Sequence, residues 1–174
     1  MRIGYGFDSH EFRAGIPLRI GGVALPHNKG LGGHSDGDVL LHAITDALLG
    51  AIAAPDIGAL FPPSDPKWKG ADSVVFLHES LERVRRAGYR LWNLDCSLIL
   101  AAPKIGPHSV AIRERVAKLL CIPSDCVGLK AKTPEGLNLE NTAVAHVVVL
   151  LERATKISVP RKSRKGSATP GKKR

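Results

Sequence analysis

The sequence predicts an α/β or α+β sandwich in which helices cover one face of a β-sheet. Strand-like segments alternate with helix-like segments along the chain, which is typical of this architecture. Apolar residues in segment 36–53 recur every three to four positions, the period of an amphipathic helix. The chain has 174 residues, 44% of them hydrophobic and 24% charged, which is enough for one folded domain with its own core.

Glycine, proline and capping residues divide the chain into elements. Gly21 and Gly22 mark the turn of a hairpin, and Gly88 marks the end of a helix that begins at Asp72. In order, we predict a strand at 1–9, a hairpin at 17–26, a glycine-rich loop at 27–35, a helix at 36–53, a long loop with one helical turn at 54–72, a helix at 72–87, a strand at 89–102, a helix at 106–121 and strands at 126–132 and 143–153.

The positive charge of the chain is concentrated at its C-terminal end. The formal net charge is +9, but residues 156–174 hold eight Lys or Arg and no acid, which leaves 17 basic and 16 acidic residues elsewhere. This segment is rich in Pro, Gly and Ser, so we predict a folded domain at 1–155 and a basic, disordered tail at 156–174. The tail is interpreted either as a solubilising appendage or as an RNA-associating arm; otherwise we expect no nucleic-acid partner.

The sequence favours a cytoplasmic protein that does not enter membranes. No apolar run approaches the roughly 18 residues of a membrane span, and the N-terminus, MRIGYGFDSH, lacks the apolar stretch of a secretory signal. Cys96, Cys121 and Cys126 are odd in number and lack the close pairing of a zinc knuckle. We therefore interpret them as reduced thiols.

Two segments far apart in the chain carry candidate metal ligands. In GFDSHEF, Asp8 and His10 are two residues apart and point to the same side of a strand. Asp38, His42 and Asp46 share one helix face. His42 is either a core histidine or a third ligand, with Asp38 or Asp46 holding its second nitrogen. Two histidines and a carboxylate with an open position match catalytic zinc and also non-haem iron.

Three loops have the composition of phosphate sites. Ser35 and Asp38 fit the Ser-x-x-acid capping box, and His34 and Ser35 precede a helix N-terminus, where free N–H groups attract anions. An ordinary capped helix explains the same residues. LAAPKIGPH and KAKTPEGLN each follow a predicted strand and combine lysine with small residues, as phosphate-binding loops do. Glu135, in the second of these, either binds a hard cation such as Mg²⁺ or is solvated.

Five of these segments together resemble a known family. RIGYGFDSH, GGHSDGDVLLHAITDALLGA, DIGALFPPSDPKWKGADS, APKIGPH and KAKTPEGL occur in the order and at the spacings of the 2-C-methyl-D-erythritol 2,4-cyclodiphosphate synthases. The resemblance covers residues 1 to about 154. It implies a homotrimer with active sites between subunits, each subunit packing a four-stranded mixed sheet against helices.

The resemblance also implies a reaction. These enzymes are phosphorus–oxygen lyases of the non-mevalonate route to isoprenoids, and their substrate is 4-diphosphocytidyl-2-C-methyl-D-erythritol 2-phosphate. Its 2-phosphate attacks the β-phosphate of the same molecule, CMP leaves and a cyclic diphosphate forms. Metal ions that bridge the phosphates would offset the repulsion between two anions.

The family's functional residues carry over onto matching positions of this chain. Asp8, His10 and His42 would hold Zn²⁺, with a substrate phosphate as fourth ligand. Glu135 would reach a second cation, Mg²⁺ or Mn²⁺. His34 and Thr133 would stabilise the transition state. The residues implied to contact the substrate are Asp8, His10, His34, Ser35, Asp56, Ile57, Gly58, Phe61, Ser64, Asp65, Pro103, Lys104, Ile105, Lys132, Thr133 and Glu135.

The chain departs from the family pattern at three places. Pro63 stands where Asp is common, and Pro134 removes an N–H from the diphosphate loop. After Leu137 the chain reads NLENTAVAHVVV, without the family's Arg and Glu. Pro63 and the altered segment after Leu137 motivate an alternative interpretation, a trimeric binding protein with weakened catalysis that keeps the metal and nucleotide sites.

Overall fold

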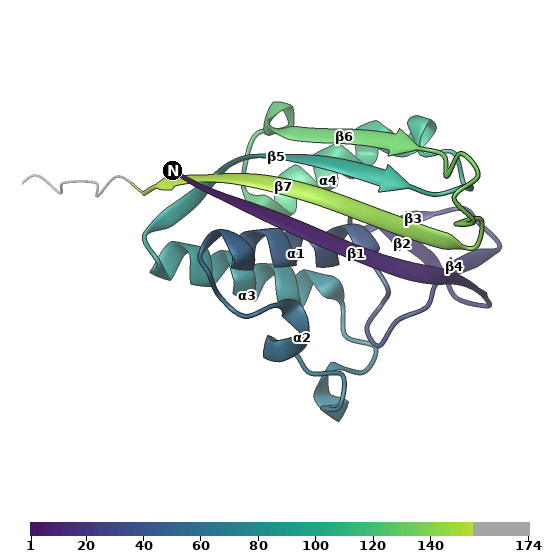
Figure 1. The fold of residues 1–174 in the computed structure, drawn as a ribbon, viewed down its shortest axis with the longest axis horizontal. Coiled ribbons are helices and arrows are strands. Elements are labelled where there is room, and N and C mark those ends of the chain that lie inside the picture. Colours follow the sequence, from purple (N-terminus) through teal and green to yellow (C-terminus); the bar gives the residue numbers. More distant parts are fainter. Residues whose placement is uncertain (155–174) are drawn as a thin grey trace, which may run out of the picture.

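A mixed five-stranded sheet in the order β4-β1-β7-β5-β6 forms the centre of the protein (Figure 1). The computed structural model describes residues 1–154. β1 pairs antiparallel with β4 and β7, and β5 pairs antiparallel with β7 and parallel with β6. The strands are β1 (Arg2–Ala14), β4 (Lys29–Leu31), β5 (Tyr89–Ile99), β6 (Val127–Lys132) and β7 (Thr142–Arg153), and a separate ribbon pairs β2 (Leu18–Ile20) with β3 (Val23–Leu25).

Helices cover one face of this sheet (Figure 1). α1 packs on β1 and β7, α3 packs on α1, and α4 packs against β6, so that one apolar core joins the helices to the sheet. Ile3, Tyr5, Phe7 and Val148 are exposed on β1 and β7. The helices are α1 (Val39–Ala51), α2 (Ile57–Leu60), α3 (Ser73–Arg86) and α4 (Ser109–Leu120), with 3₁₀ turns η1 (Pro66–Trp68), η2 (Gly106–His108) and η3 (Ser124–Cys126).

The α+β class is confirmed, but the expected four-stranded sheet is wrong because the predicted glycine-rich loop at 27–35 contains a fifth strand. β4 (Lys29–Leu31) pairs with the far end of β1, which runs to Ala14 rather than to residue 9. A Cβ at Gly30 would lie 2.4 Å from the carbonyl oxygens of Ile16 and Pro17. Glycine here therefore serves a close backbone approach within a strand, which local sequence rules interpret as a loop.

The predicted capping box at the start of α1 is also wrong. Asp38 is itself the N-cap: its carboxylate accepts the Leu41 N–H at 3.0 Å, and α1 begins at Val39 rather than at residue 36. The same carboxylate accepts the N–H groups of Gly21 at 2.9 Å and Gly22 at 2.6 Å. These contacts come from the β2–β3 turn, so Asp38 joins the hairpin to the helix.

Most other predicted elements are confirmed. The hairpin turns at Gly21 and Gly22, Asp72 caps α3, and Gly88 follows α3 with a φ of 81°.

All three cysteines are free thiols, and burial raises the pKa of Cys96 to about 12. Within residues 1–154, no helix has the length and hydrophobicity needed to span a bilayer. The tail predicted at 156–174 lies outside the described residues.

Candidate active site

The close approach of α1 to β1 brings the candidate metal ligands together. Gly4, Gly6, Asp8 and His10 alternate along one face of β1. A Cβ at Gly4 would lie 1.8 Å from the carbonyl oxygen of Ala47, and one at Gly6 would lie 1.9 Å from that of Ala43. The helix backbone therefore rests directly on the glycines, at a distance that no side chain would permit.

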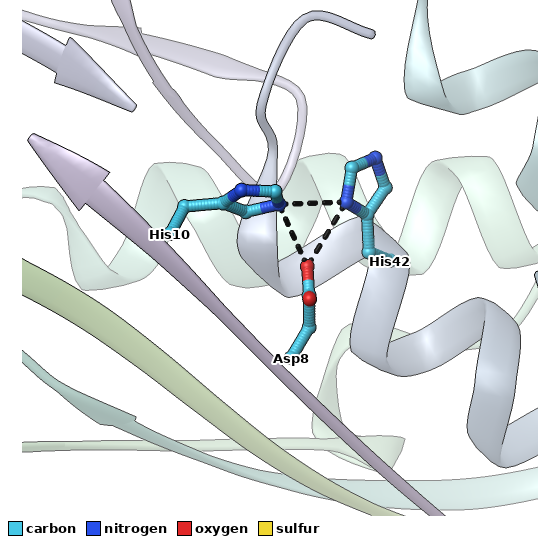
Figure 2. A group of neighbouring side chains, drawn as sticks. All are labelled: Asp8, His10 and His42. Atoms are coloured by element: carbon cyan, nitrogen blue, oxygen red, sulfur yellow. Dashed lines mark hydrogen bonds and ion pairs between the residues drawn. The ribbon is translucent and has the colours of Figure 1, made fainter. Parts of the chain in front are cut away.

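Asp8, His10 and His42 point toward one another across this contact (Figure 2). Asp8 Oδ2 lies 2.9 Å from His10 Nε2 and 3.0 Å from His42 Nδ1, and the two ring nitrogens are 3.0 Å apart. The strand supplies two of the side chains and the helix supplies the third, as the sequence predicts.

The donor set fits a small divalent cation. Ligands about 2.0–2.2 Å from a tetrahedral zinc lie roughly 3.3 Å from one another, close to the 2.9–3.0 Å separations of these three atoms. The side chains of Asp8, His10 and His42 are 26, 16 and 11% exposed. The cluster is thus largely desolvated, yet it remains open enough for a fourth ligand to reach it.

The electrostatics of the cluster favour a charged carboxylate. Burial raises the pKa of Asp8, but hydrogen bonds and charge interactions with His10 and His42 outweigh burial and lower this pKa to about 2. Burial lowers the pKa of His10, but its hydrogen bond and charge interaction with Asp8 outweigh burial and raise this pKa above the usual histidine value. Asp8 is therefore an ionised ligand at neutral pH.

Two serines, rather than an aspartate, contact the second nitrogen of His42. Ser35 Oγ lies 2.9 Å and Ser73 Oγ 2.8 Å from His42 Nε2. The hypothesis that Asp38 or Asp46 fills this role is wrong, because Asp38 binds the hairpin amides and Asp46 accepts the Ile57 N–H at 2.8 Å. Sequence reasoning missed Ser73, which lies 31 residues from His42 and has no distinguishing local pattern.

A cavity of about 230 Å³ opens beside the metal ligands. Phe61, Trp68 and Phe76 form an aromatic cluster in its wall, with ring centroids 4.7–5.6 Å apart. The cavity is therefore apolar on one side and polar beside the histidines. Its lining residues are His10, His34, Ser35, His42, Ile57, Gly58, Phe61, Pro63, Trp68 and Phe76, which include five of the predicted substrate contacts beyond the metal ligands.

Three predicted substrate contacts in the loop at 54–72 lie outside this lining. Asp56 caps α2 by accepting the Ala59 N–H at 2.7 Å, and Asp65 caps η1 by accepting the Lys67 N–H at 3.0 Å. Ser64 is exposed between them. The two carboxylates thus shape the loop at 54–72 that carries the cavity wall.

A second cavity of about 570 Å³ lies where β5 and β6 end. The two strands are parallel, so their carboxyl ends meet at one edge of the sheet, a common place for ligands in α/β folds. The Thr133 hydroxyl donates to the Glu135 carboxylate. This cavity brings together six predicted residues, namely Pro103, Lys104, Ile105, Lys132, Thr133 and Glu135.

The two cavities share no lining residue. Among the described residues, Glu135 does not join the cluster of Asp8, His10 and His42. The resemblance implies active sites between neighbouring subunits, and a single chain presents the predicted site residues as two separate groups.

Comparison with known proteins identifies the family. The sequence model of the YgbB family matches residues 1–152. The chain is 72% identical over 153 residues to the 2-C-methyl-D-erythritol 2,4-cyclodiphosphate synthase of Koribacter versatilis. This match covers 88% of this chain and 99% of the relative. It is 52% identical over 155 residues to the chloroplastic enzyme of the same name from Oryza sativa. That match covers 87% of this chain and 70% of the relative.

A solved structure extends the likeness to the fold. The structure of a 2-C-methyl-D-erythritol 2,4-cyclodiphosphate synthase in its CDP-bound form superposes with a TM-score of 0.83 at 45% identity. The match covers 87% of this chain and 100% of that one. On this evidence the chain belongs to the YgbB family, the 2-C-methyl-D-erythritol 2,4-cyclodiphosphate synthases.

Proposed function

We propose that the chain converts 4-diphosphocytidyl-2-C-methyl-D-erythritol 2-phosphate to 2-C-methyl-D-erythritol 2,4-cyclodiphosphate and CMP in the non-mevalonate isoprenoid pathway, as its family membership indicates. An oxygen of the 2-phosphate attacks the β-phosphorus, and the bond to the CMP oxygen breaks. The protein forms no covalent bond, so it acts as a phosphorus–oxygen lyase through positioning and charge stabilisation. The observation that carries the proposal is the convergence of Asp8, His10 and His42 beside a cavity.

We assign Zn²⁺ to the three converging side chains. Two imidazole nitrogens and one carboxylate oxygen would hold the cation and leave it accessible to a phosphate oxygen of the substrate. The same donors suit non-haem iron, but the reaction changes no oxidation state and needs no redox metal. When bound, the cation would neutralise negative charge on the phosphate and so help two anions approach each other.

His34 and Ser35 hold the phosphate beside this position. Both line the cavity, and the Ser35 hydroxyl lies next to His42. The Gly70 N–H donates to the His34 carbonyl at 2.8 Å, which fixes the segment relative to the loop before α3. In our proposal the His34 imidazole donates to a phosphate oxygen on which charge accumulates in the transition state.

The methylerythritol part of the substrate occupies the part of the first cavity that the loop between α1 and α3 lines. Ile57, Gly58 and Phe61 provide an apolar wall for its methyl group and carbon chain. Asp56 and Asp65 each use one carboxylate oxygen to cap a helix, and the other oxygen can accept a substrate hydroxyl. Ser64, which lies between the two caps, adds a further hydroxyl.

The cytidine diphosphate part occupies the second cavity. Pro103, Lys104 and Ile105 border the nucleotide, and a CDP-bound relative supports a nucleotide ligand. Lys132 and Thr133 face the diphosphate from the end of β6. Glu135, which already accepts the Thr133 hydroxyl, binds the second cation, Mg²⁺ or Mn²⁺.

We further propose that three copies assemble into a ring, with the metal cavity of one subunit facing the nucleotide cavity of its neighbour. Two features support this assembly: the two groups of site residues line separate cavities, and one chain leaves Ile3, Tyr5, Phe7 and Val148 exposed on the sheet. When one surface of each subunit contacts a different surface of the next, the copies form a closed ring if the rotation between neighbours closes. Residues 1–155 would form the catalytic domain of a cytoplasmic enzyme.

Incubation of purified protein with substrate and Mg²⁺ tests the reaction. We expect stoichiometric CMP by chromatography and a cyclic diphosphate by ³¹P NMR. No CMP under conditions in which the Koribacter versatilis relative turns over would refute the activity. A protein that binds CDP yet releases no CMP would be the weakened binding protein, the alternative that Pro63 and the altered segment after Leu137 motivate.

A further inference from the structure

A buried serine and an aspartate stand behind the metal ligand His42. Ser73 is the first residue of α3 and has no exposed surface. Its hydroxyl oxygen lies 2.8 Å from His42 Nε2 and also forms a hydrogen bond with the carboxylate of Asp36. The backbone N–H of Ser73 donates to the other oxygen of that carboxylate at 3.3 Å. Asp36, Ser73 and His42 therefore form a chain that ends at the ring.

The direction of the hydrogen bonds in this chain follows from the number of protons available. The Ser73 hydroxyl donates its single proton to the Asp36 carboxylate. The oxygen of Ser73 is then left to accept, so the proton between it and His42 lies on Nε2, and Ser35 Oγ, 2.9 Å from the same nitrogen, is a second acceptor for it. His42 is thereby held with Nε2 protonated and with the lone pair of Nδ1 directed at Asp8 and His10.

We propose that Ser73 and Asp36 are positioning residues that fix the tautomer and the orientation of His42 for metal binding. Histidine ligands of metals commonly donate their second N–H to a carboxylate, and such partners raise metal affinity. Here a serine hydroxyl is inserted between the ring and the carboxylate. The inference rests on the proposed metal site, and it adds two residues that touch neither metal nor substrate.

The same aspartate fixes the loop that precedes α1. The Asp36 N–H donates to the Ala71 carbonyl at 3.1 Å, and Asp36 Oδ1 accepts the Asp38 N–H at 3.2 Å. The segment that carries His34 and Ser35 is thereby tied to the start of α3. A change at Asp36 should therefore disturb both the metal ligand and the phosphate loop, whereas a change at Ser73 should act mainly through His42.

Zinc affinity, measured by competition with a chromophoric chelator, tests the proposal without reference to catalysis. We expect Ser73→Ala to weaken zinc binding by about 10- to 100-fold and to alter the visible spectrum of the Co²⁺-substituted protein. Ser73→Thr, which retains the hydroxyl, should restore most of the affinity. Asp36→Asn should weaken binding as well, because the serine proton loses its charged acceptor.

Ser80→Ala is the matched control. Ser80 lies on the same helix and is equally buried, but its hydroxyl donates to the Leu77 carbonyl and does not contact His42. Zinc affinities and Co²⁺ spectra that are the same for Ser73→Ala and Ser80→Ala would overturn the positioning role. A wild-type protein that binds no zinc would overturn the metal site itself, and the inference with it.

Discussion

At the scale of single residues, the site depends on three donor atoms held within 3.0 Å of one another before any ligand arrives. Asp8 provides the negative charge that keeps two imidazoles close together, and its pKa of about 2 keeps it ionised. An imidazole, in contrast, binds a metal only in its neutral form. Protons and metal therefore compete for the rings and not for the carboxylate.

This competition predicts how zinc binding depends on pH. Asp8 raises the pKa of His10, so His10 holds its proton at a higher pH than an ordinary histidine, whose pKa is about 6.5. We expect the dissociation constant for zinc to rise as pH falls through the raised pKa of His10, by roughly tenfold per pH unit for each proton displaced. Equilibrium titrations between about pH 5.5 and 8 measure it. A constant affinity across that range would contradict the role of the imidazoles.

The position of Glu135 predicts how the activity depends on the second cation. Its carboxylate lies in the second cavity, apart from Asp8, His10 and His42. We expect Glu135→Gln to raise the Mg²⁺ concentration needed for half-maximal activity and to leave the zinc content unchanged. Activity against Mg²⁺ concentration, with elemental analysis of the same samples, checks both. Loss of zinc with an unchanged Mg²⁺ requirement would reverse the assignment of the two metals.

At the scale of elements, the site is set by how closely α1 approaches β1. The carbonyl of Ala43, the neighbour of His42, occupies the place that a side chain at Gly6 would need. Gly6 is also two residues from Asp8 on the same face of the strand. The two glycines of β1 are thus a condition for the metal site, although neither of them could bind an ion.

Gly6→Ala should therefore damage both the fold and the metal site. The added Cβ would lie 1.9 Å from a backbone oxygen, so α1 must move. We expect a loss of about 3 kcal/mol or more in the free energy of unfolding, together with weaker zinc binding.

The control is Gly50→Ala on α1, where an added Cβ meets only the Tyr5 carbonyl oxygen, at 3.6 Å. Alanine favours helix over glycine, so stability should hold or rise by up to about 1 kcal/mol. Urea unfolding measures both variants. Equal stabilities would show that the close approach is not required.

The elements that were predictable from the sequence are those with local causes. Asp72 and Gly88 bound α3 because a cap and a positive φ act within one turn. β4 was not predictable, because glycine is required at position 30 by the close approach of the Ile16 and Pro17 carbonyls, which lie in another part of the sequence. Asp38 matched a local capping pattern, but its main partners are the amides of a separate hairpin.

The candidate site divides in the same way. Asp8, His10 and His42 follow from strand and helix periodicity combined with the family resemblance. Ser73 and its contact with His42 do not, because the contact joins the starts of two helices that are adjacent only in the folded chain. Trp68 and Phe76, which line the first cavity, are likewise placed by the packing of α3 beside the loop at 54–72.

At the scale of the whole molecule, the separation of the two cavities predicts complementation between subunits. In the proposed assembly, His42→Ala would remove the metal half of the site, and Lys132→Glu would repel the diphosphate from the other half. Each variant alone should be inactive. Ring assemblies refolded from an equal mixture should regain about one quarter of the wild-type activity, because a site needs one intact half from each neighbour.

Turnover of mixed and separate samples at equal protein concentration measures the effect. The control is a mixture assembled separately and combined without refolding, which should stay inactive. An active site contained within one subunit predicts no recovery in either sample, and that result would refute the arrangement between subunits.

The central claim is that Asp8, His10 and His42 hold one cation. The zinc content of purified wild type and His42→Ala, determined by elemental analysis, tests it most directly, with His78→Ala as control because His78 is an exposed histidine of α3. We expect one zinc per chain in wild type and His78→Ala, and almost none in His42→Ala. Equal zinc in all three proteins, or none in wild type supplied with excess zinc, would contradict it.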